Sequence, residues 1–226
     1  MNTIASASAA AMLLPHTDPA AGGKAQHAEL TKEEINQLPL RAWEGDVIIV
    51  REQRQLSAAL AMLQKEKVLG FDTETKPCFT KGHTALPALI QLATQNNVFL
   101  FQLKHLCLGL ELAGLLSSNE HLKVGVAIHD DMKALGRLYP FEAGGIVDIA
   151  QMARSQGIKA QGLRTLAANL LGFRISKGAQ CSNWENEDLT PQQIKYAATD
   201  AWVGRQLYCY LAAGLLKTPL QALAKA

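Results

Sequence analysis

Short apolar runs separated by polar turns occupy the first half of the folded part of the chain. The β-branched run at 46–50 predicts a strand, and the stretch 51–65 predicts a helix because Leu56, Leu60 and Leu63 recur at helical spacing. Four further apolar runs, bounded by Gly, Asn or polar clusters, also predict strands. The expected strands are 46–50, 68–72, 86–94, 97–102 and 122–128.

Helical patterns dominate the second half. The spacing of apolar residues predicts helices over 103–116 and 130–138, and most of 148–216 is expected to be helical. Strands gathered early, with helices between and after them, are typical of an α/β domain with a mixed central β-sheet, not of a doubly wound parallel one. We expect a sheet of about five strands flanked by α-helices.

The first 39 residues differ in composition from the rest. They begin with an Ala-, Ser- and Gly-rich stretch that Pro15 and Pro19 interrupt, so we expect a disordered leader. A secretory signal is the alternative for the weakly apolar segment 9–14, but no Lys or Arg precedes it. Thr31 followed by Glu34 is a capping-box pattern, which predicts a short helix before the domain begins near residue 40.

Composition and charge narrow the class of protein. The chain has 226 residues, of which 48% are hydrophobic and 19% charged, which suits one globular domain with a buried core. Lys and Arg total 22 against 20 for Asp and Glu, so a nucleic-acid-binding surface must be local. The 4 cysteines lack disulfide or zinc-site spacing, which favours a cytoplasmic protein. No apolar stretch approaches the roughly 20 residues of a membrane span.

Two carboxylates stand at the end of the expected strand 68–72. Because side chains alternate across a strand, Asp72 and Glu74 point to the same side of the sheet. Like charges on one face repel each other, and a hard divalent cation with oxygen ligands relieves that repulsion. A solvated strand edge explains the pair equally well, so the motif alone leaves both interpretations open.

Two further acidic positions fall on expected helices. The Thr-Pro pair at 190–191 opens a helix on which Tyr196 and Asp200, four residues apart, share one face. A core-facing Tyr beside an unrelated surface Asp is the alternative. Asp130 and Asp131 fall in the first turn of an earlier helix, where capping accounts for Asp130 but Asp131 is a candidate ligand.

The order of these motifs resembles the three exonuclease motifs of the DEDD superfamily: Asp-x-Glu, an Asp where a strand meets a helix, and Tyr-x-x-x-Asp. The Tyr variant is matched, because Tyr196 lies four residues before Asp200, whereas the His of the other variant would fall at Lys195. Similarity to the ribonuclease D and Werner-helicase exonuclease group extends to segments 70–75, 88–93, 123–126, 163–167, 182–184 and 189–194. An exonuclease domain over residues 40–220 is therefore implied.

The resemblance implies a ribonuclease H-like fold and a 3′-5′ exonuclease that removes nucleotides from the 3′ end of DNA or RNA. It also implies two Mg²⁺ or Mn²⁺ ions, with Asp72 contacting both. Glu74 and Asp200 would complete the site that activates water, and Asp131 would hold the second ion. Tyr196 would orient the attacking water, since an ordinary phenol is a poor base at neutral pH.

Substrate contacts follow less directly from the same resemblance. Thr75 and Trp184 are expected beside the terminal nucleotide, and Lys177 is expected to meet a phosphate. A catalytically inactive ribonuclease H-like nucleic-acid-binding domain is the alternative, and the presence of all four carboxylates and the Tyr argues against it. The sequence indicates no oligomeric state and no preference between DNA and RNA.

Overall fold

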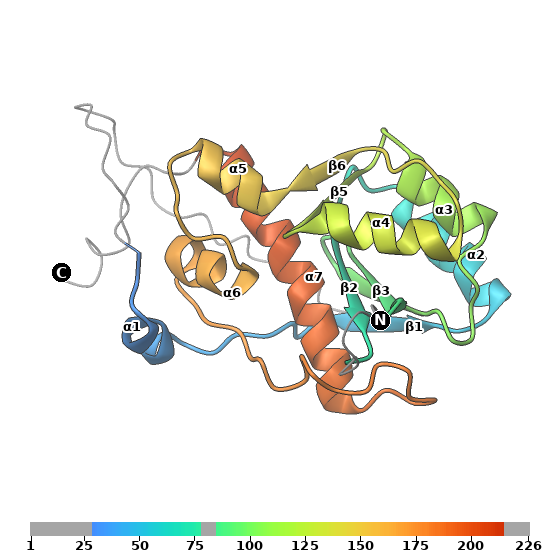
Figure 1. The fold of residues 1–226 in the computed structure, drawn as a ribbon, viewed down its shortest axis with the longest axis horizontal. Coiled ribbons are helices and arrows are strands. Elements are labelled where there is room, and N and C mark those ends of the chain that lie inside the picture. The colour runs from blue at the N-terminus through green and yellow to red at the C-terminus, as the bar shows by residue number, and fades with distance from the viewer. Residues whose placement is uncertain (1–28, 78–84, 215–226) are drawn as a thin grey trace, which may run out of the picture.

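A mixed β-sheet between two layers of helices forms the protein (Figure 1). The structure, a computed structural model, describes residues 29–77 and 85–214, so the leader expected before residue 29 and the expected domain end at 220 lie outside the described residues. The strands are β1 (Asp46–Val50), β2 (Val68–Thr75), β3 (Pro87–Ala93), β4 (Asn97–Gln102), β5 (Leu122–Gly125) and β6 (Ile146–Asp148). The helices are α1 (Lys32–Gln37), α2 (Gln53–Leu63), α3 (Leu110–Ser117), α4 (Ile128–Leu138), α5 (Ile149–Ser155), α6 (Leu163–Leu166), the π-helical turn η1 (Ala167–Leu171) and α7 (Pro191–Ala212).

The strands lie in the order β1-β4-β3-β2-β5-β6. β3 is antiparallel to β4 and β2, whereas β1 pairs with β4, and β5 with β2 and β6, in parallel. The predicted α/β class and mixed sheet are confirmed, and each of the five predicted strands is present. The additional strand β6 was not predicted, because its 3 residues are too few to show an alternating pattern.

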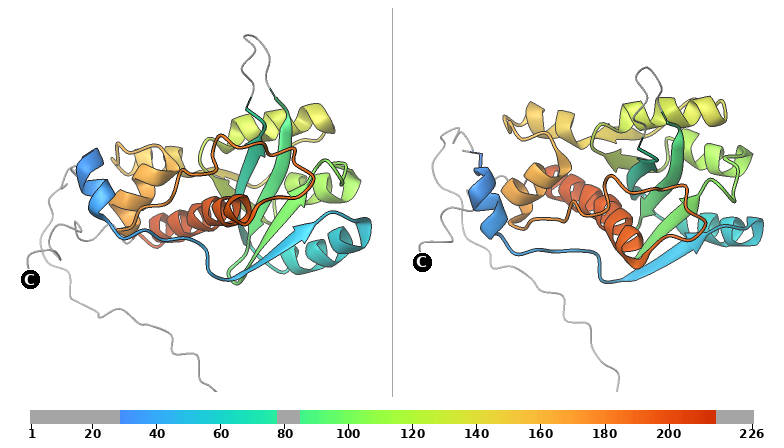
Figure 2. Two further views of the ribbon diagram at one scale, coloured as in Figure 1. Left: turned by 90° about the horizontal axis from the view of Figure 1, so that it is seen from below. Right: turned by 60° about the horizontal axis from the view of Figure 1, so that its bottom comes forward.

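Helices α2, α3 and α4 cover one face of the sheet, and α5, α6 and α7 cover the other (Figures 1 and 2). The first face packs around Phe71, Phe99 and Phe101, all buried. On the second face, Leu89 and Leu100 pack under a stripe of alanines on α7. Small side chains let α7 lie close to the sheet, and α7 crosses four of its strands. In the described part of the chain, no helix is both long and apolar enough to cross a membrane.

The second half is less helical than the sequence pattern predicted. Segment 103–109 forms no helix, and neither does segment 172–190, where Gly172 ends the preceding turn with a positive φ of 73°. Ion pairs hold the second segment in place: Lys76–Glu185 at 2.9 Å and Arg51–Asp188 at 2.8 Å. The apolar residues of segment 172–190 therefore make tertiary contacts and do not form the apolar face of a helix. The spacing of apolar residues alone cannot distinguish these two roles.

Two helix starts can be compared with the sequence. The short helix predicted after Thr31 is confirmed as α1, and Thr31 and Glu34 make both hydrogen bonds of the capping box. The strand expected to reach residue 128 instead ends at Gly125, because Ala127 adopts a left-handed φ of 57° and α4 begins at Ile128. Asp130 therefore lies inside the first turn of α4 and does not cap it, contrary to the prediction.

Gly70 allows α7 to approach β2 closely. A Cβ atom at this position would lie 2.0 Å from the backbone oxygen of Ala201 on α7. Gly70, Asp72 and Glu74 alternate along β2 and so share the face that α7 covers. The contact at Gly70 thus sets the distance between the acidic end of β2 and Asp200, the neighbour of Ala201.

Lys123 caps the end of α3 from inside the protein. Its buried Nζ donates to the carbonyl oxygens of Leu115, Ser118 and His121 at 3.1, 2.6 and 2.8 Å. We expect Lys123→Met to lower the free energy of unfolding by about 3 kcal/mol, because three acceptors lose their donor. Urea denaturation measures the change. The exposed Lys133→Met is the control, expected to change stability by no more than about 0.5 kcal/mol; equal losses in the two variants would contradict this role of Lys123.

Candidate active site

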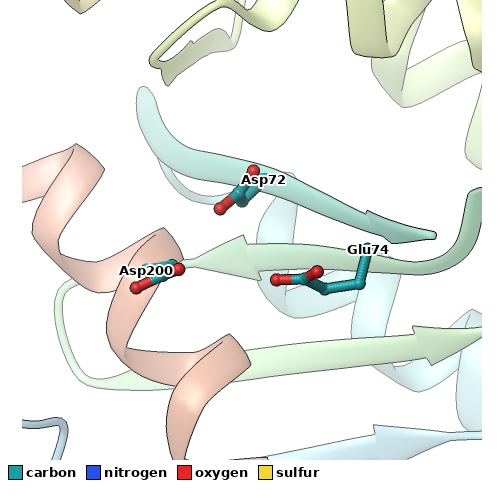
Figure 3. A group of neighbouring side chains, drawn as sticks. All are labelled: Asp72, Glu74 and Asp200. Carbon is teal, nitrogen blue, oxygen red and sulfur yellow. The ribbon is translucent and has the colours of Figure 1, made fainter. Parts of the chain in front are cut away.

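Three carboxylates from two elements meet at the face of the sheet under α7. Asp72 and Glu74 project from β2 on the same side, in keeping with strand alternation, and Asp200 projects toward them from α7 (Figure 3). One oxygen of each carboxylate lies within 4.8 Å of the others. The structure therefore brings together the first and the last of the acidic motifs, which are far apart in the sequence.

Tyr196 lies one turn before Asp200 on α7. The helix starts as the sequence indicated: the Thr190 side chain accepts a hydrogen bond from the backbone N–H of Gln193, and Pro191 occupies the first turn. This start fixes the rotation of α7, so Tyr196 and Asp200 line the same cavity.

Trp184 was predicted to contact substrate, but the structure buries it to 1% exposure. Its indole packs against the ring of Tyr196, with the ring centroids 6.0 Å apart and the planes tilted by 44°. A side chain with so little exposed surface offers no face for a base to stack on, so Trp184 supports Tyr196 instead. Thr75 lies at an irregularity in the pairing of β2 and does not line the cavity, whereas Lys177 does.

Asp131 reaches the site from the opposite layer. It lies in the first turn of α4, where its Oδ1 accepts a 2.6 Å hydrogen bond from Thr73 Oγ1. Thr73 stands between the two acids of β2 and points to the other face of the sheet. Asp131 is outside the group of three carboxylates, yet its charge contributes to raising the pKa of Asp72. The neighbouring Asp130 points away and forms an exposed ion pair with Lys133 at 3.3 Å.

A cavity of about 900 Å³ opens in front of the carboxylates. This volume lies near the upper end of the usual range for ligand sites, about 300 to 1,000 Å³. The lining includes Asp72, Glu74, Tyr196, Asp200, Arg164 and Lys177. The cavity therefore joins an acidic end, formed by β2 and α7, to basic side chains from α6 and from the segment before α7.

Burial and mutual repulsion favour the protonated forms of the acidic side chains. Burial, followed by the charges of Asp72 and Asp200, raises the pKa of Glu74 to about 10. Burial raises the pKa of Asp131 to about 6 and that of Asp200 to about 7. The pKa of Asp72 is raised well above its ordinary value by burial and then by the charges of Asp200 and Asp131. So many carboxyls with raised pKa values are typical of a site that binds a cation.

The donor atoms fit hard divalent cations such as Mg²⁺ or Mn²⁺. All the candidate ligands are carboxylate oxygens, which these ions prefer over nitrogen or sulfur. Asp200 Oδ1 is buried and has no hydrogen-bond partner among the described residues, so it is free to accept a positive charge. A cation would also relieve the repulsion among Asp72, Glu74 and Asp200.

Divalent ions are expected to stabilise the protein more at high pH than at low pH. The folded, metal-free chain keeps protons on Asp131 and Asp200 up to about pH 6 and 7, whereas the unfolded chain loses them near pH 4. The folded state thus binds more protons in this window, so its stability falls as pH rises through it, and ions that bind the ionised carboxylates offset that loss.

The measurement is a thermal melt with Mg²⁺ or with EDTA at two pH values. We expect Mg²⁺ to raise Tm by several degrees at about pH 8 and by less than about 1 °C at about pH 5. Potassium chloride at matched ionic strength is the control for general screening. An equal rise at both pH values would show that these carboxyls do not titrate as described.

A carboxylate cluster on a central strand of a mixed sheet, under a helix that carries a Tyr and an Asp, is the arrangement expected of an exonuclease of the DEDD type. The chain belongs to the 3′-5′ exonuclease family, whose model matches residues 47–215. The match includes every candidate catalytic residue from Asp72 to Asp200.

Relatives in animals carry the same domain within longer chains. The chain is 35% identical over 150 residues to exonuclease 3′-5′ domain-containing protein 2 of Drosophila melanogaster, covering 64% of this chain and 25% of the relative. It is 31% identical over 183 residues to the bifunctional 3′-5′ exonuclease/ATP-dependent helicase WRN of Mus musculus, covering 76% and 13%. The chain thus spans a quarter or less of the length of these two relatives.

Solved structures confirm the fold. The EXO domain of Nibbler from Aedes aegypti superposes with a TM-score of 0.70 at 24% identity, covering 81% of this chain and 98% of that domain. RNase D of Escherichia coli superposes with a TM-score of 0.65 at 19% identity, covering 77% and 47%. The ribonuclease H-like architecture predicted from the motifs is therefore correct.

Sequence reasoning overlooked three side chains near the carboxylates. Thr73 bonds to Asp131, and the exposed Cys181 lies close enough to Glu74 to affect its pKa. Gln91 is fully buried opposite Asp72 in the β2–β3 pairing, and neither its amide nitrogen nor its oxygen has a hydrogen-bond partner among the described residues. Gln91 could have been noticed in the sequence as a single polar residue within an apolar strand. Nothing in the sequence indicated Thr73 or Cys181.

Proposed function

We propose that this chain removes nucleotides one at a time from the 3′ end of DNA or RNA, by hydrolysis that depends on two divalent metal ions. The observation that carries the proposal is the set of three carboxylates within 4.8 Å, with Asp131 bonded beside them, at one end of a large cavity. Membership of the 3′-5′ exonuclease family supplies the reaction type.

Asp72, Glu74, Asp131 and Asp200 would hold the ions, Mg²⁺ or Mn²⁺. When bound, such ions stabilise the negative charge that develops on the phosphate oxygens and lower the pKa of a bound water. The protein supplies the ligands and holds them in place: Gly70 sets the distance between β2 and α7, and Thr73 fixes the Asp131 carboxylate. Binding the ions requires the carboxyls to lose their protons, so activity should rise from about pH 6 to 8.

Tyr196 would orient the attacking water, which assigns the chain to the Tyr variant of the superfamily. Burial, together with the nearby charges of Asp200 and Glu74, raises the pKa of Tyr196 above its ordinary value. The phenol therefore keeps its proton near neutral pH and acts as a hydrogen-bond donor or acceptor, not as a general base.

Tyr196→Phe is expected to reduce kcat by about 10²-fold with little change in KM, because it removes a positioning hydroxyl and leaves the carboxylates intact. Steady-state kinetics on a labelled single strand measure both constants. The rise in Tm caused by Mg²⁺ should persist in this variant, which separates a loss of water positioning from a loss of metal. An unchanged kcat would remove Tyr196 from the mechanism.

The proposed function is tested by digesting 5′-labelled DNA and RNA strands of one sequence with Mg²⁺ or Mn²⁺. A ladder that shortens from the 3′ end and is absent with the Asp72→Ala, Glu74→Ala double variant supports the proposal and identifies the preferred polymer. Absence of cleavage of both strands by the unsubstituted chain would overturn it and favour the inactive nucleic-acid-binding domain.

A further inference from the structure

Helix α1 forms part of the wall of the active-site cavity, although it precedes the segment 47–215 that the exonuclease family model matches. Lys32, Ile35 and Asn36 line the same cavity as the metal-site carboxylates. These three residues have the i, i+3, i+4 spacing of one helix face. The acidic residues of the helix, Glu33 and Glu34, are not part of the lining.

Several contacts hold α1 against α6 and η1. The backbone N–H of Leu30 donates to Asn169 Oδ1 at 2.9 Å, and Arg164 donates to Asn36 Oδ1 at 3.0 Å. Ile35 is buried to 6% exposure. Figures 1 and 2 show α1 beside α6 in every view. The helix is therefore a fixed part of the cavity, and its contact with Arg164 couples it to a basic residue of the domain.

The segment that joins α1 to the domain is also anchored. Arg174 Nε donates to the carbonyl of Leu38 at 3.0 Å, its backbone N–H donates to Pro39, and its carbonyl accepts from the N–H of Arg41. These bonds run on both sides of Arg174 and form a short parallel bridge at Leu40. The position of α1 is thus set by backbone pairing as well as by side chains.

Three basic side chains line the cavity: Lys32 of α1, Arg164 of α6 and Lys177 of the segment before α7. None of them forms an ion pair within residues 29–77 and 85–214. The carboxylates of β2 and α7 line the same cavity, and α1 and α6 lie on the side of α7 away from β2 (Figure 1). A cavity that combines these unpaired basic side chains with a candidate metal site suits a chain of phosphates.

We propose that α1 is a substrate-binding element, in which Lys32, together with Arg164 and Lys177, contacts backbone phosphates of the nucleotides that precede the 3′-terminal one. This inference rests on the proposed function, because it assumes that the carboxylate end receives the 3′ terminus. It extends the substrate site beyond the domain that the family defines. The ligand is a single polynucleotide strand, whose backbone phosphates contact the basic side chains of the cavity.

The test compares Lys32→Gln with Lys65→Gln in the full chain. Lys65 is an exposed lysine beyond α2 that neither lines the cavity nor forms an ion pair in the described parts. Binding of a fluorescent single strand of about 12 nucleotides is followed by anisotropy in EDTA, across a range of salt concentrations, so that nothing is cleaved.

Loss of one phosphate contact lowers the slope of log affinity against log salt by about 0.7 for a single strand, or about fivefold in affinity at about 0.1 M salt. We expect this change for Lys32→Gln and none for Lys65→Gln. A purely structural role of Lys32 would not alter the salt slope, and equal Tm values exclude misfolding.

Three results are possible. A smaller slope for Lys32→Gln alone supports the phosphate contact, and the digestion assay separately tests the 3′-end function on which the inference rests. Identical slopes for Lys32→Gln and the unsubstituted chain overturn the inference while leaving the exonuclease proposal intact. Failure of the unsubstituted chain to bind the strand at any salt concentration overturns it as well.

Discussion

Asp72→Asn is expected to reduce cleavage at the 3′ end by at least about a thousandfold while the protein remains folded. A neutral amide is a weak ligand for a divalent ion, and the loss of several kcal/mol of charge stabilisation in the transition state corresponds to such a factor. Asp72 is the residue to change because it would hold the ions together with Glu74, Asp131 and Asp200, and it lies within 4.8 Å of both Glu74 and Asp200. The rate of product formation from a 5′-labelled strand in Mg²⁺ measures the effect.

The stability of Asp72→Asn distinguishes lost chemistry from lost structure. In the metal-free chain, the charges of Asp200 and Asp131 repel an ionised Asp72 and raise its pKa, and an uncharged Asn removes that repulsion. An Asn at this position carries no charge to desolvate or repel, so we expect the variant to melt in EDTA at the same temperature as the unsubstituted chain or higher. The rise in Tm that Mg²⁺ causes should be lost.

Asp130→Asn is the matched control. It makes the same chemical change on α4, at an exposed residue whose only ion pair among the described residues is with Lys133. Its activity should remain within about twofold of the unsubstituted chain. A comparable loss of activity in Asp72→Asn and Asp130→Asn would mean that general charge, and not metal ligation, governs cleavage.

The parts of the site that lie on single regular elements were predictable from the sequence. Strand alternation placed Asp72 and Glu74 on one face, and helical spacing placed Tyr196 and Asp200 on one face. These inferences need only the local period of the backbone. The acids of β2 meet Tyr196 and Asp200 because α7 crosses β2. The family resemblance implied this meeting, but the local period of a strand or a helix cannot show it.

Contacts between layers and irregular segments were not predictable. The hydrogen bond from Thr73 to Asp131 joins β2 to α4, two elements far apart in the sequence, so neither alternation nor helical spacing indicates it. Trp184 lies in the non-helical segment before α7, where no period exists to distinguish a buried side chain from an exposed one. The wall formed by α1 depends on the bridge at Leu40, a contact between residues far apart in the sequence.

Gly70→Ala is expected to impair both stability and cleavage, although the added group is one methyl. The new Cβ would lie 2.0 Å from the oxygen of Ala201 and 2.9 Å from the Cβ of Arg205. The first neighbour is backbone, so α7 must move away from β2. Overpacking of this kind costs about 3 kcal/mol, measured as the change in the free energy of unfolding in urea.

The same shift separates Asp200 from Asp72 and Glu74. A displacement of about 1 Å at a catalytic site lowers the rate by about 10²-fold, so Gly70→Ala should lose activity even under conditions in which it is fully folded. Its affinity for Mg²⁺, followed by the rise in Tm, should also fall, because one ligand of the three-carboxylate group is moved.

Gly114→Ala tests whether these losses come from the contact and not from the change of residue type. Gly114 lies within α3 and a Cβ there would have no neighbour within 4 Å, so alanine should stabilise that helix by up to about 1 kcal/mol and leave cleavage unchanged. If Gly70→Ala cleaves normally, α7 can accommodate the methyl without moving Asp200. The distance between β2 and α7 would then not be what assembles the metal site.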